Sequence, residues 1–214
     1  MKQGLEILYQ DKQIVVVNKP SGVLSVPGRG PEKYDSISTR VKESIPGCLA
    51  QPAVHRLDMD TSGILVLALT KEAHRDLSIQ FQNRRTKKRY VALLDGVVKG
   101  PREAGTIELP FRLDIENRPY QIYDPIHGKM GVTHWRKIRI EGELTRVEFV
   151  PVTGRTHQLR VHASHEKGLG IPISGDLLYG TGTENAQLKL HAESLSFDHP
   201  ETGETMTFQI NALF

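Results

Sequence analysis

The chain has 214 residues, of which 38% are hydrophobic and 25% are charged. This length and composition allow a buried core without disulfides and exclude the disordered and fibrous classes. The single cysteine, Cys48, cannot form an internal disulfide or begin a cysteine-rich zinc site, so we expect a cytoplasmic protein. The N-terminus has no signal-peptide pattern, and the longest apolar run, Ile64–Leu69, is too short to span a membrane.

The formal net charge of +3 is unevenly distributed along the chain. Residues 84–89 read Arg-Arg-Thr-Lys-Lys-Arg and carry five positive charges, so the rest of the chain sums to 3 − 5 = −2. Such a cluster is typical of a phosphate-binding surface, because each neutralised phosphate releases counterions. The alternative is a solvated helix end, since basic side chains favour the last turn of a helix. The sequence leaves both interpretations open.

Two strands are predicted in the first third of the chain. Ile14–Val17 is a short run rich in β-branched residues, and the Pro and Gly of Asn18–Gly22 predict a turn after it. Ile64–Leu69 is continuously apolar, as expected of a strand that is buried on both faces.

Two helices are predicted beside these strands. The first covers Ser36–Glu43, with Asp35 or Ser36 as its N-cap. The second follows Thr70 as N-cap and covers Lys71–Asn83. Its buried stripe has apolar residues at intervals of four, namely Ala73, Leu77 and Phe81.

The second half of the chain is predicted to be rich in strands. Tyr90–Leu94 is a strand candidate, and the region Gly96–Pro125 is punctuated by Gly and Pro and receives no strand. Thr133–Ile140 and Thr145–Val152 predict a hairpin. A helix is expected over Arg155–Glu166, and two late strands follow, at Leu188–Phe197 and Thr205–Ile210. The sum is an α+β fold, and because no linker interrupts the chain we expect one domain over residues 1–214.

Several common motifs are absent from the sequence. It has no Gly-x-Gly-x-x-Gly after a strand, no P-loop and no Gly-x-Ser-x-Gly elbow, so nothing indicates a dinucleotide, a nucleotide or a serine nucleophile. The glycine-rich piece Val26–Pro31 contains two prolines, which favours an ordinary loop over an anion cradle. Three histidines, His157, His162 and His165, share one predicted helix, but partner ligands cannot be placed, so we predict no metal site.

Two polar segments carry more information. His55–Gly63 places a His, an Arg, two carboxylates and two hydroxyls directly before the buried strand, where functional loops are common. A polar turn with local Asp hydrogen bonds is the alternative. Thr153–His162 follows a strand and begins a helix, so its amides and Arg155 could hold an anion. A plain capping turn with Thr156 as N-cap is the alternative.

Together these segments resemble the RluA family of pseudouridine synthases. The resemblance covers almost the whole chain and includes four ordered motifs, namely Val16–Gly22, His55–Asp58 with Thr61–Gly63, Lys88–Tyr90 and Thr153–His162. It implies a pseudouridine synthase fold, with a mixed, mainly antiparallel sheet, flanking helices and a central RNA-binding cleft. The short segment before the first motif implies that the N-terminal S4 domain of many relatives is absent.

The resemblance implies that the protein isomerises specific uridines in RNA without a cofactor or a metal. Asp58 would be the catalytic carboxylate, because breaking a glycosidic bond develops positive charge on the sugar that an ionised Asp can stabilise, trap or relieve. Arg155 would pair with Asp58 and keep it ionised. Tyr90 would stack on the uracil or hydrogen-bond to it, and Arg56 would help to extrude the nucleotide.

The same resemblance assigns RNA binding to the basic run, whose members are Arg84, Arg85, Lys87, Lys88 and Arg89. Two further segments, Leu24–Arg29 and Asn117–Gln121, resemble the dual-specificity members of the family, which act on 23S ribosomal RNA and on a tRNA anticodon stem-loop. We therefore expect RNA as the partner, no membrane, no obligate protein partner and a monomer.

Two alternatives remain at this level. A non-catalytic protein that binds or remodels RNA could keep the same fold, although binding alone does not require Asp58, Tyr90 and Arg155 together. A carboxylate-dependent glycosidase would need a second acid at a defined separation. Asp60 is too near in sequence to supply that acid convincingly, and a basic surface suits a polyanion better than a neutral sugar.

Overall fold

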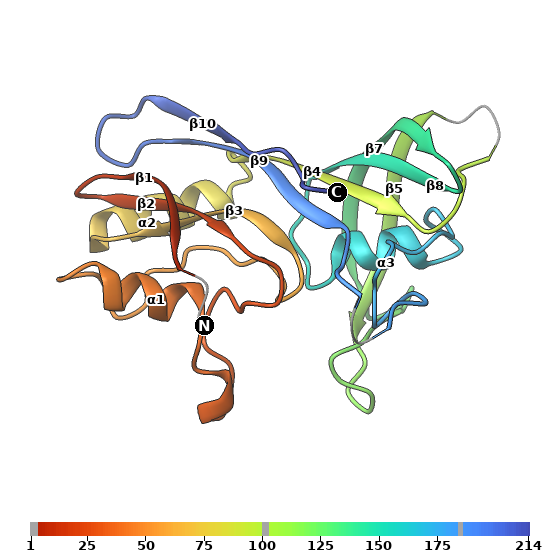
Figure 1. The fold of residues 1–214 in the computed structure, drawn as a ribbon, viewed down its shortest axis with the longest axis horizontal. Helices are drawn as coiled ribbons and strands as arrows, with labels where there is room; N and C mark the ends of the chain where they lie inside the picture. The colour runs from red at the N-terminus through yellow and green to blue at the C-terminus, as the bar shows by residue number, and fades with distance from the viewer. Residues whose placement is uncertain (1–3, 100–102, 184–185) are drawn as a thin grey trace. The chain divides into compact units, whose positions relative to one another are not determined.

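The computed structural model describes residues 4–99, 103–183 and 186–214, and it combines a mixed sheet with three α-helices (Figure 1). The predicted α+β class is therefore confirmed. The chain divides into two compact units, which we call unit 1 (Met1–Lys88 with His191–Leu213) and unit 2 (Arg89–Leu190 with Phe214). Over the described ranges, no helix is long and apolar enough to cross a membrane.

Unit 1 is built on five strands in the order β1-β2-β3-β9-β10. All neighbours are antiparallel except β3 and β9, which run parallel and make the sheet mixed. The strands are β1 (Glu6–Gln10), β2 (Ile14–Lys19), β3 (Ser62–Ala68), β9 (Leu190–Asp198) and β10 (Thr205–Gln209). The predicted strands at 14–17, 64–69, 188–197 and 205–210 are thus confirmed, with small changes at their ends.

Both predicted helices of unit 1 are present, as α1 (Ile37–Ser44) and α2 (Lys71–Gln82). Ser36 is the N-cap of α1 and Thr70 that of α2, and each side-chain oxygen accepts from a backbone amide three residues on. One face of α2 joins β2, β3 and β9 in a core cluster, made of Ile14, Val16, Ile64, Val66, Ala68, Ala73, Leu77, Leu195 and Phe197. The residues between these on β2 and β3 are equally buried, so this part of the sheet is covered on both faces.

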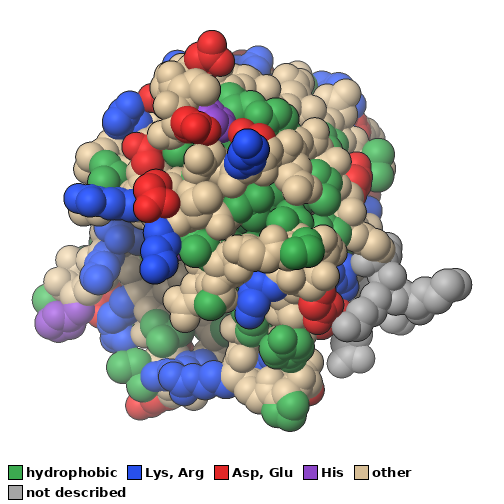
Figure 2. Space-filling model, turned by 90° about the vertical axis from the view of Figure 1, so that its left-hand side faces the viewer, with side chains coloured by type: hydrophobic (Ala, Val, Ile, Leu, Met, Phe, Trp, Pro, Cys, Tyr) green, Lys and Arg blue, Asp and Glu red, His purple; other side chains and the backbone are tan. Residues whose placement is uncertain are grey.

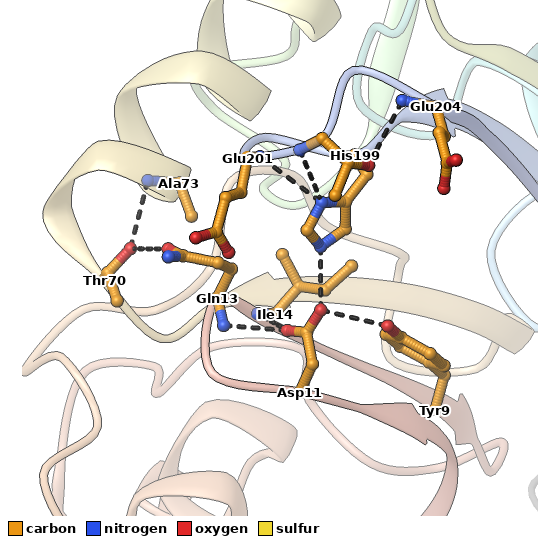
Figure 3. Close-up of polar contacts among 10 residues, drawn as sticks. Tyr9, Asp11, Gln13, Ile14, Thr70, Ala73, His199, Glu201 and Glu204 are labelled. Carbon is orange, nitrogen blue, oxygen red and sulfur yellow. Dashed lines mark hydrogen bonds and ion pairs between the residues drawn. The ribbon is translucent and has the colours of Figure 1, made fainter.

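A cluster of hydrogen bonds around Asp11 connects the two hairpins of unit 1 (Figure 3). The carboxylate lies 2.7 Å from His199 Nε2 and accepts from the Tyr9 hydroxyl over 3.0 Å. It also accepts from the backbone amides of Gln13 and Ile14. Burial raises the pKa of Asp11, but these hydrogen bonds outweigh it and hold the pKa below its usual 3.8. The β1–β2 turn is therefore tied to the β9–β10 turn.

Unit 2 contains an antiparallel sheet in the order β4-β8-β7-β5-β6. Its strands are β4 (Lys87–Leu94), β5 (Ala104–Leu113), β6 (Gln121–Tyr123), β7 (Lys129–Glu141) and β8 (Leu144–Pro151). The predicted hairpin is confirmed as β7 and β8. The region 96–125, to which the sequence assigned no element, contains β5 and β6. Ile107, Leu109 and Phe111 alternate along β5 and are buried, but Gly105 and Pro110 mask this period in the sequence.

The third helix, α3 (Gln158–Ser164), begins three residues later than predicted. Its N-cap is His157 in a left-handed conformation, with φ 56°, and not Thr156. A 3-10 turn, η1 (Pro31–Lys33), follows the glycine-rich loop. Leu159 and Ala163 of α3 are buried as expected, in the core of unit 2, which also contains Ala92, Leu94, Ile107, Leu109, Phe111, Trp135, Val147, Phe149, Val161, Ile173, Leu188 and Leu190.

Charged side chains are unevenly distributed over the face of the protein drawn in Figure 2. On the face drawn in Figure 2, Lys and Arg side chains gather along one side with carboxylates among them, while hydrophobic side chains lie in small separate groups.

Candidate active site

Asp58 lies in the loop before β3, and its side chain is half-buried. Hydrogen bonds fix this loop on both sides of Asp58. Upstream, the amide of Leu57 donates to Ser25 Oγ over 2.9 Å, and the same hydroxyl donates to the Leu57 carbonyl over 2.7 Å. Downstream, Ser21 Oγ donates to the Asp60 carbonyl over 2.7 Å. The carboxylate is therefore presented by a loop whose backbone has little freedom.

Lys19 also fixes this loop, and it is fully buried at the end of β2. Its ammonium donates to the Met59 carbonyl over 2.7 Å and to two carbonyls of its own turn, those of Pro20 at 2.9 Å and Val23 at 2.6 Å. Burial lowers the pKa of Lys19 to about 7, and the carboxylates of Asp60 and Asp58 oppose that shift. Three carbonyl acceptors use all three ammonium protons, so the geometry suits the charged form.

The two residues at the start of the motif His55–Asp58 have different environments. His55 is half-buried, its ring stacks on Phe81 with 4.3 Å between centroids, and its Nε2 accepts from the Val66 amide over 3.2 Å. Burial, helped by the charge of Lys88, lowers the pKa of His55 to about 3, so it remains neutral and acts as a scaffold. Arg56 is exposed to solvent, as a residue that contacts RNA would have to be.

The last residues of the segment His55–Gly63, Ser62 and Gly63, hold β3 against β9. Gly63 has φ 115°, and a Cβ there would lie 2.3 Å from the Ala192 carbonyl oxygen, so only glycine fits where β3 meets β9. Ser62 Oγ lies 2.8 Å from His191 Nδ1 and adds a side-chain contact between the same strands. These contacts fix the point at which the Asp58 loop enters the sheet.

In unit 2, Gln158 organises the turn that carries Arg155. Its Oε1 accepts from Thr153 Oγ1 over 2.7 Å and from the Arg155 amide over 3.0 Å. Its Nε2 donates to the Val132 carbonyl and the Thr133 hydroxyl over 3.0 and 2.9 Å. The turn is thereby attached to β7, and the Arg155 side chain is exposed.

Tyr90 is half-buried near the start of β4 and packs against the core of unit 2. It pairs with Phe149 near the end of the antiparallel strand β8, and Arg155 follows that end by four residues. Tyr90 and the Arg155 turn therefore lie at the same end of the unit 2 sheet. Because side chains alternate along a strand, Lys88 points to the same face as Tyr90.

The basic run begins after α2 and continues into β4. The last turn of α2 contains no basic residue, and the helix ends before Arg84, which is exposed in a left-handed conformation with φ 57°. Lys87 is also exposed, as the first residue of β4. The solvated helix end is therefore a poor description of most of the run.

Three members of the basic run either lie beside a carboxylate or are partly buried. Arg85 forms an ion pair with Asp198 at 2.7 Å, and Arg89 lies 3.5 Å from Glu148. Burial, with a contribution from the charge of Arg84, lowers the pKa of Lys88. Part of the positive charge of the run is thus balanced by neighbouring carboxylates, while Arg84, Arg85 and Lys87 are exposed.

The structure assigns the predicted catalytic residues to different units. Asp58 and Arg56 belong to unit 1, and Tyr90 and Arg155 belong to unit 2. The pairing of Arg155 with Asp58 stays a prediction.

The histidines that could have suggested a metal do not form a site. Across residues 4–99, 103–183 and 186–214, no three His, Cys, Asp or Glu residues are grouped so that they could hold a metal ion. His162 is fully buried, and within those ranges neither ring nitrogen has a hydrogen-bond partner. Burial lowers the pKa of His162 to about 4, so it is a neutral core residue.

The support of the Arg155 turn was not predicted from the sequence. Arg160 and Asp176 form a buried ion pair with contacts of 2.8 and 2.6 Å, and Asp176 also accepts from the Tyr179 amide over 3.0 Å. The signal available in the sequence was the second arginine of the motif, which needs a counterion when a helix buries it. No motif marked Tyr179.

Comparison with known proteins identifies the family. The family described as RNA pseudouridylate synthase matches residues 13–165, well over half of the chain. The chain belongs to this family. This pseudouridylate synthase is 48% identical to the "Dual-specificity RNA pseudouridine synthase RluA" of Haemophilus influenzae, over 98% of the chain and 94% of the relative. The protein of that name from Escherichia coli K12 is 47% identical with the same coverage.

A solved structure supports the same assignment. The pseudouridylate synthase is similar to "Human RNA Pseudouridylate Synthase Domain Containing 1", with a TM-score of 0.77 and 29% identity, over 99% of this chain and 86% of the human one. The predicted pseudouridine synthase fold and the predicted enzyme class, an isomerase that converts uridine to pseudouridine in RNA, are therefore confirmed.

Proposed function

We propose that this enzyme modifies two classes of RNA, 23S ribosomal RNA and a tRNA anticodon stem-loop. The observation that carries the proposal is the similarity to relatives named dual-specificity RNA pseudouridine synthase. Those from Haemophilus influenzae, Yersinia pestis and Escherichia coli are 47–48% identical over 97–98% of the chain. We further propose that residues 1–214 act as one catalytic domain, as a cytoplasmic monomer without an obligate protein partner.

We propose Asp58 as the catalytic carboxylate. Breaking the glycosidic bond of uridine develops positive charge on the sugar, and an ionised carboxylate can stabilise it, trap it covalently or accept a proton. The hydrogen bonds of Ser25, Ser21 and Lys19 to the surrounding loop support this role. A fixed backbone places the carboxylate before the substrate arrives, so less reorganisation is needed in the transition state.

The other site residues have roles that suit their chemistry. Arg155 pairs with Asp58, because a guanidinium and a carboxylate form a strong charge-assisted contact. Tyr90 stacks on the uracil or hydrogen-bonds to it. Arg56 helps to displace the target nucleotide, which must be extruded before the enzyme can reach it. The exposure of Arg56 and Arg155 supports these assignments.

The basic run is proposed to contact RNA phosphates. Its members Arg84, Arg85, Lys87, Lys88 and Arg89 lead directly to Tyr90, so phosphate contacts would lie beside the residue that handles the base. The exposure of Arg84 and Lys87 supports this most directly.

The test uses two RNAs that carry tritium at uracil C5, a 23S ribosomal transcript and a tRNA anticodon stem-loop. Isomerisation forms a carbon–carbon bond at C5, so each modified uridine releases tritium to water. We expect release from both RNAs in chelator-treated buffer. Release from one RNA alone would contradict dual specificity. No release from either, with salt-sensitive binding retained, would favour the non-catalytic RNA-binding alternative.

A further inference from the structure

The turn that carries Arg155 contains a strained residue. His157 adopts φ 56° and ψ 17°, a left-handed conformation that costs about 1 kcal/mol or more for a residue with a Cβ. Such a conformation persists only where surrounding contacts hold it. The turn is exposed at residues 154–156, between buried Thr153 and buried Gln158. The orientation of Arg155 therefore depends on what fixes the turn at its two ends.

The N-terminal end of the turn is fixed by the Gln158 side chain, which accepts from Thr153 and from the Arg155 amide as described above. The C-terminal end is fixed through the His157 side chain. His157 Nδ1 lies 2.8 Å from the hydroxyl of Tyr179, and the two rings meet edge to face with 5.6 Å between centroids. This contact joins residues 22 positions apart in the chain.

Tyr179 is itself held rigidly. The Gln121 amide donates to its hydroxyl oxygen over 2.9 Å, which leaves the hydroxyl proton available for His157 Nδ1. The Tyr179 amide donates to Asp176, and the guanidinium of Arg160 lies 5.4 Å from the centre of its ring. Arg160 and Asp176 are almost completely buried, so this support has little freedom to move.

From this geometry we infer that Tyr179 is a positioning residue, which holds Arg155 in its working orientation through His157. The inference rests on the proposed function, in which Arg155 pairs with the catalytic carboxylate. A small misplacement of a group that orients the reaction can lower the rate about 100-fold. Tyr179 therefore acts on the chemical step through His157 and Arg155.

The test compares kcat and KM for tritium release in four proteins: the wild type, Tyr179→Phe, Arg155→Ala and the double variant. Tyr179→Phe keeps the ring and its packing but removes the hydroxyl. We expect it to lower kcat about 10- to 100-fold while KM changes less than about 2-fold. In the Arg155→Ala background the same substitution should have almost no further effect, because residues that act as a unit are not additive.

Two further variants complete the test, one that breaks the same contact and one control. In His157→Asn the new side chain is compatible with the left-handed conformation but too short to reach Tyr179, so this variant should lower kcat as Tyr179→Phe does. Tyr9→Phe removes a hydroxyl that is hydrogen-bonded over 3.0 Å in unit 1 and should leave kcat unchanged. His157→Asn also keeps the inference testable if Tyr179→Phe does not fold.

The outcomes separate this inference from the proposed function. Unchanged kcat in Tyr179→Phe, additive losses in the double variant, or a rise in KM alone would each overturn the positioning role while Arg155→Ala still has a lowered, measurable kcat. Full activity of Arg155→Ala would instead show that the role proposed for Arg155 is wrong, and the positioning role with it.

Discussion

The buried ammonium of Lys19 donates a hydrogen bond to the carbonyl of Met59 over 2.7 Å, at the residue that follows Asp58. This contact joins the motif Val16–Gly22 to the loop that contains Asp58, between residues 40 positions apart. The Asn18–Gly22 turn is therefore part of the support for the Asp58 loop. It helps to fix the loop that presents the Asp58 carboxylate.

Lys19→Met should destabilise the protein markedly. The substitution leaves three carbonyl oxygens without their donor, and unsatisfied buried acceptors cost about 1–3 kcal/mol each, so we expect a loss of about 3 kcal/mol or more. Urea unfolding followed by circular dichroism measures it. The control is Lys12→Met, which removes an exposed lysine from the neighbouring turn and should change stability little. A loss below about 1 kcal/mol for Lys19→Met would contradict the support role.

RNA affinity should depend steeply on salt, and the basic run should set part of that dependence. Each phosphate contact contributes about one unit to the slope of log affinity against log salt, so replacing Arg84 and Arg85 with Gln should lower the slope by about one to two units. Arg84 should contribute more, because Arg85 is paired with Asp198. Filter binding at several salt concentrations measures the slopes, with Arg75→Gln on α2 as the control. An unchanged slope would show that the run does not contact phosphates.

Stability should fall in mild acid because of buried neutral histidines. The pKa of His162 is lowered from 6.5 to about 4, and that of His55 to about 3. As the pH drops below 6.5 the unfolded chain binds protons at these positions and the folded chain does not, so the free energy of unfolding decreases.

His162→Leu removes one of these sites. The decrease in the free energy of unfolding between pH 6.5 and 4 should therefore be smaller than in the wild type by up to about 3 kcal/mol. Urea unfolding over this pH range tests it, with His127→Leu in an exposed loop as the control. Identical pH profiles for His162→Leu and the wild type would show that His162 is protonated within the fold.

Much of unit 1 follows from local sequence signals. The apolar run of β3, the Thr70 cap and the four-residue period of α2 each predict one structure, and packing confirms it. In unit 2 the local sequence signals are weaker. Pro110 masks the alternation of buried and exposed residues in β5. The Gln158 side chain accepts a hydrogen bond from the Arg155 amide, so α3 begins later than its composition implies.

The motifs predict a candidate site, but no local pattern predicts the contacts that support it. The segments around Asp58 and Arg155 are short, ordered and recognisable in the sequence. The contacts of Lys19 with residue 59 and of His157 with Tyr179 join positions 40 and 22 residues apart. Only the fold brings such positions together, so no local pattern reports them.

The most direct test of the account is tritium release by Asp58→Ala, measured beside Asp60→Ala and the wild type on the same RNA. Asp60 lies in the same loop and carries the same charge, so its removal controls for the electrostatic change. The account predicts that Asp58→Ala releases no tritium above background while it binds RNA as the wild type does, and that Asp60→Ala keeps most of its turnover. Substantial release by Asp58→Ala would contradict the assignment of Asp58 as the catalytic carboxylate.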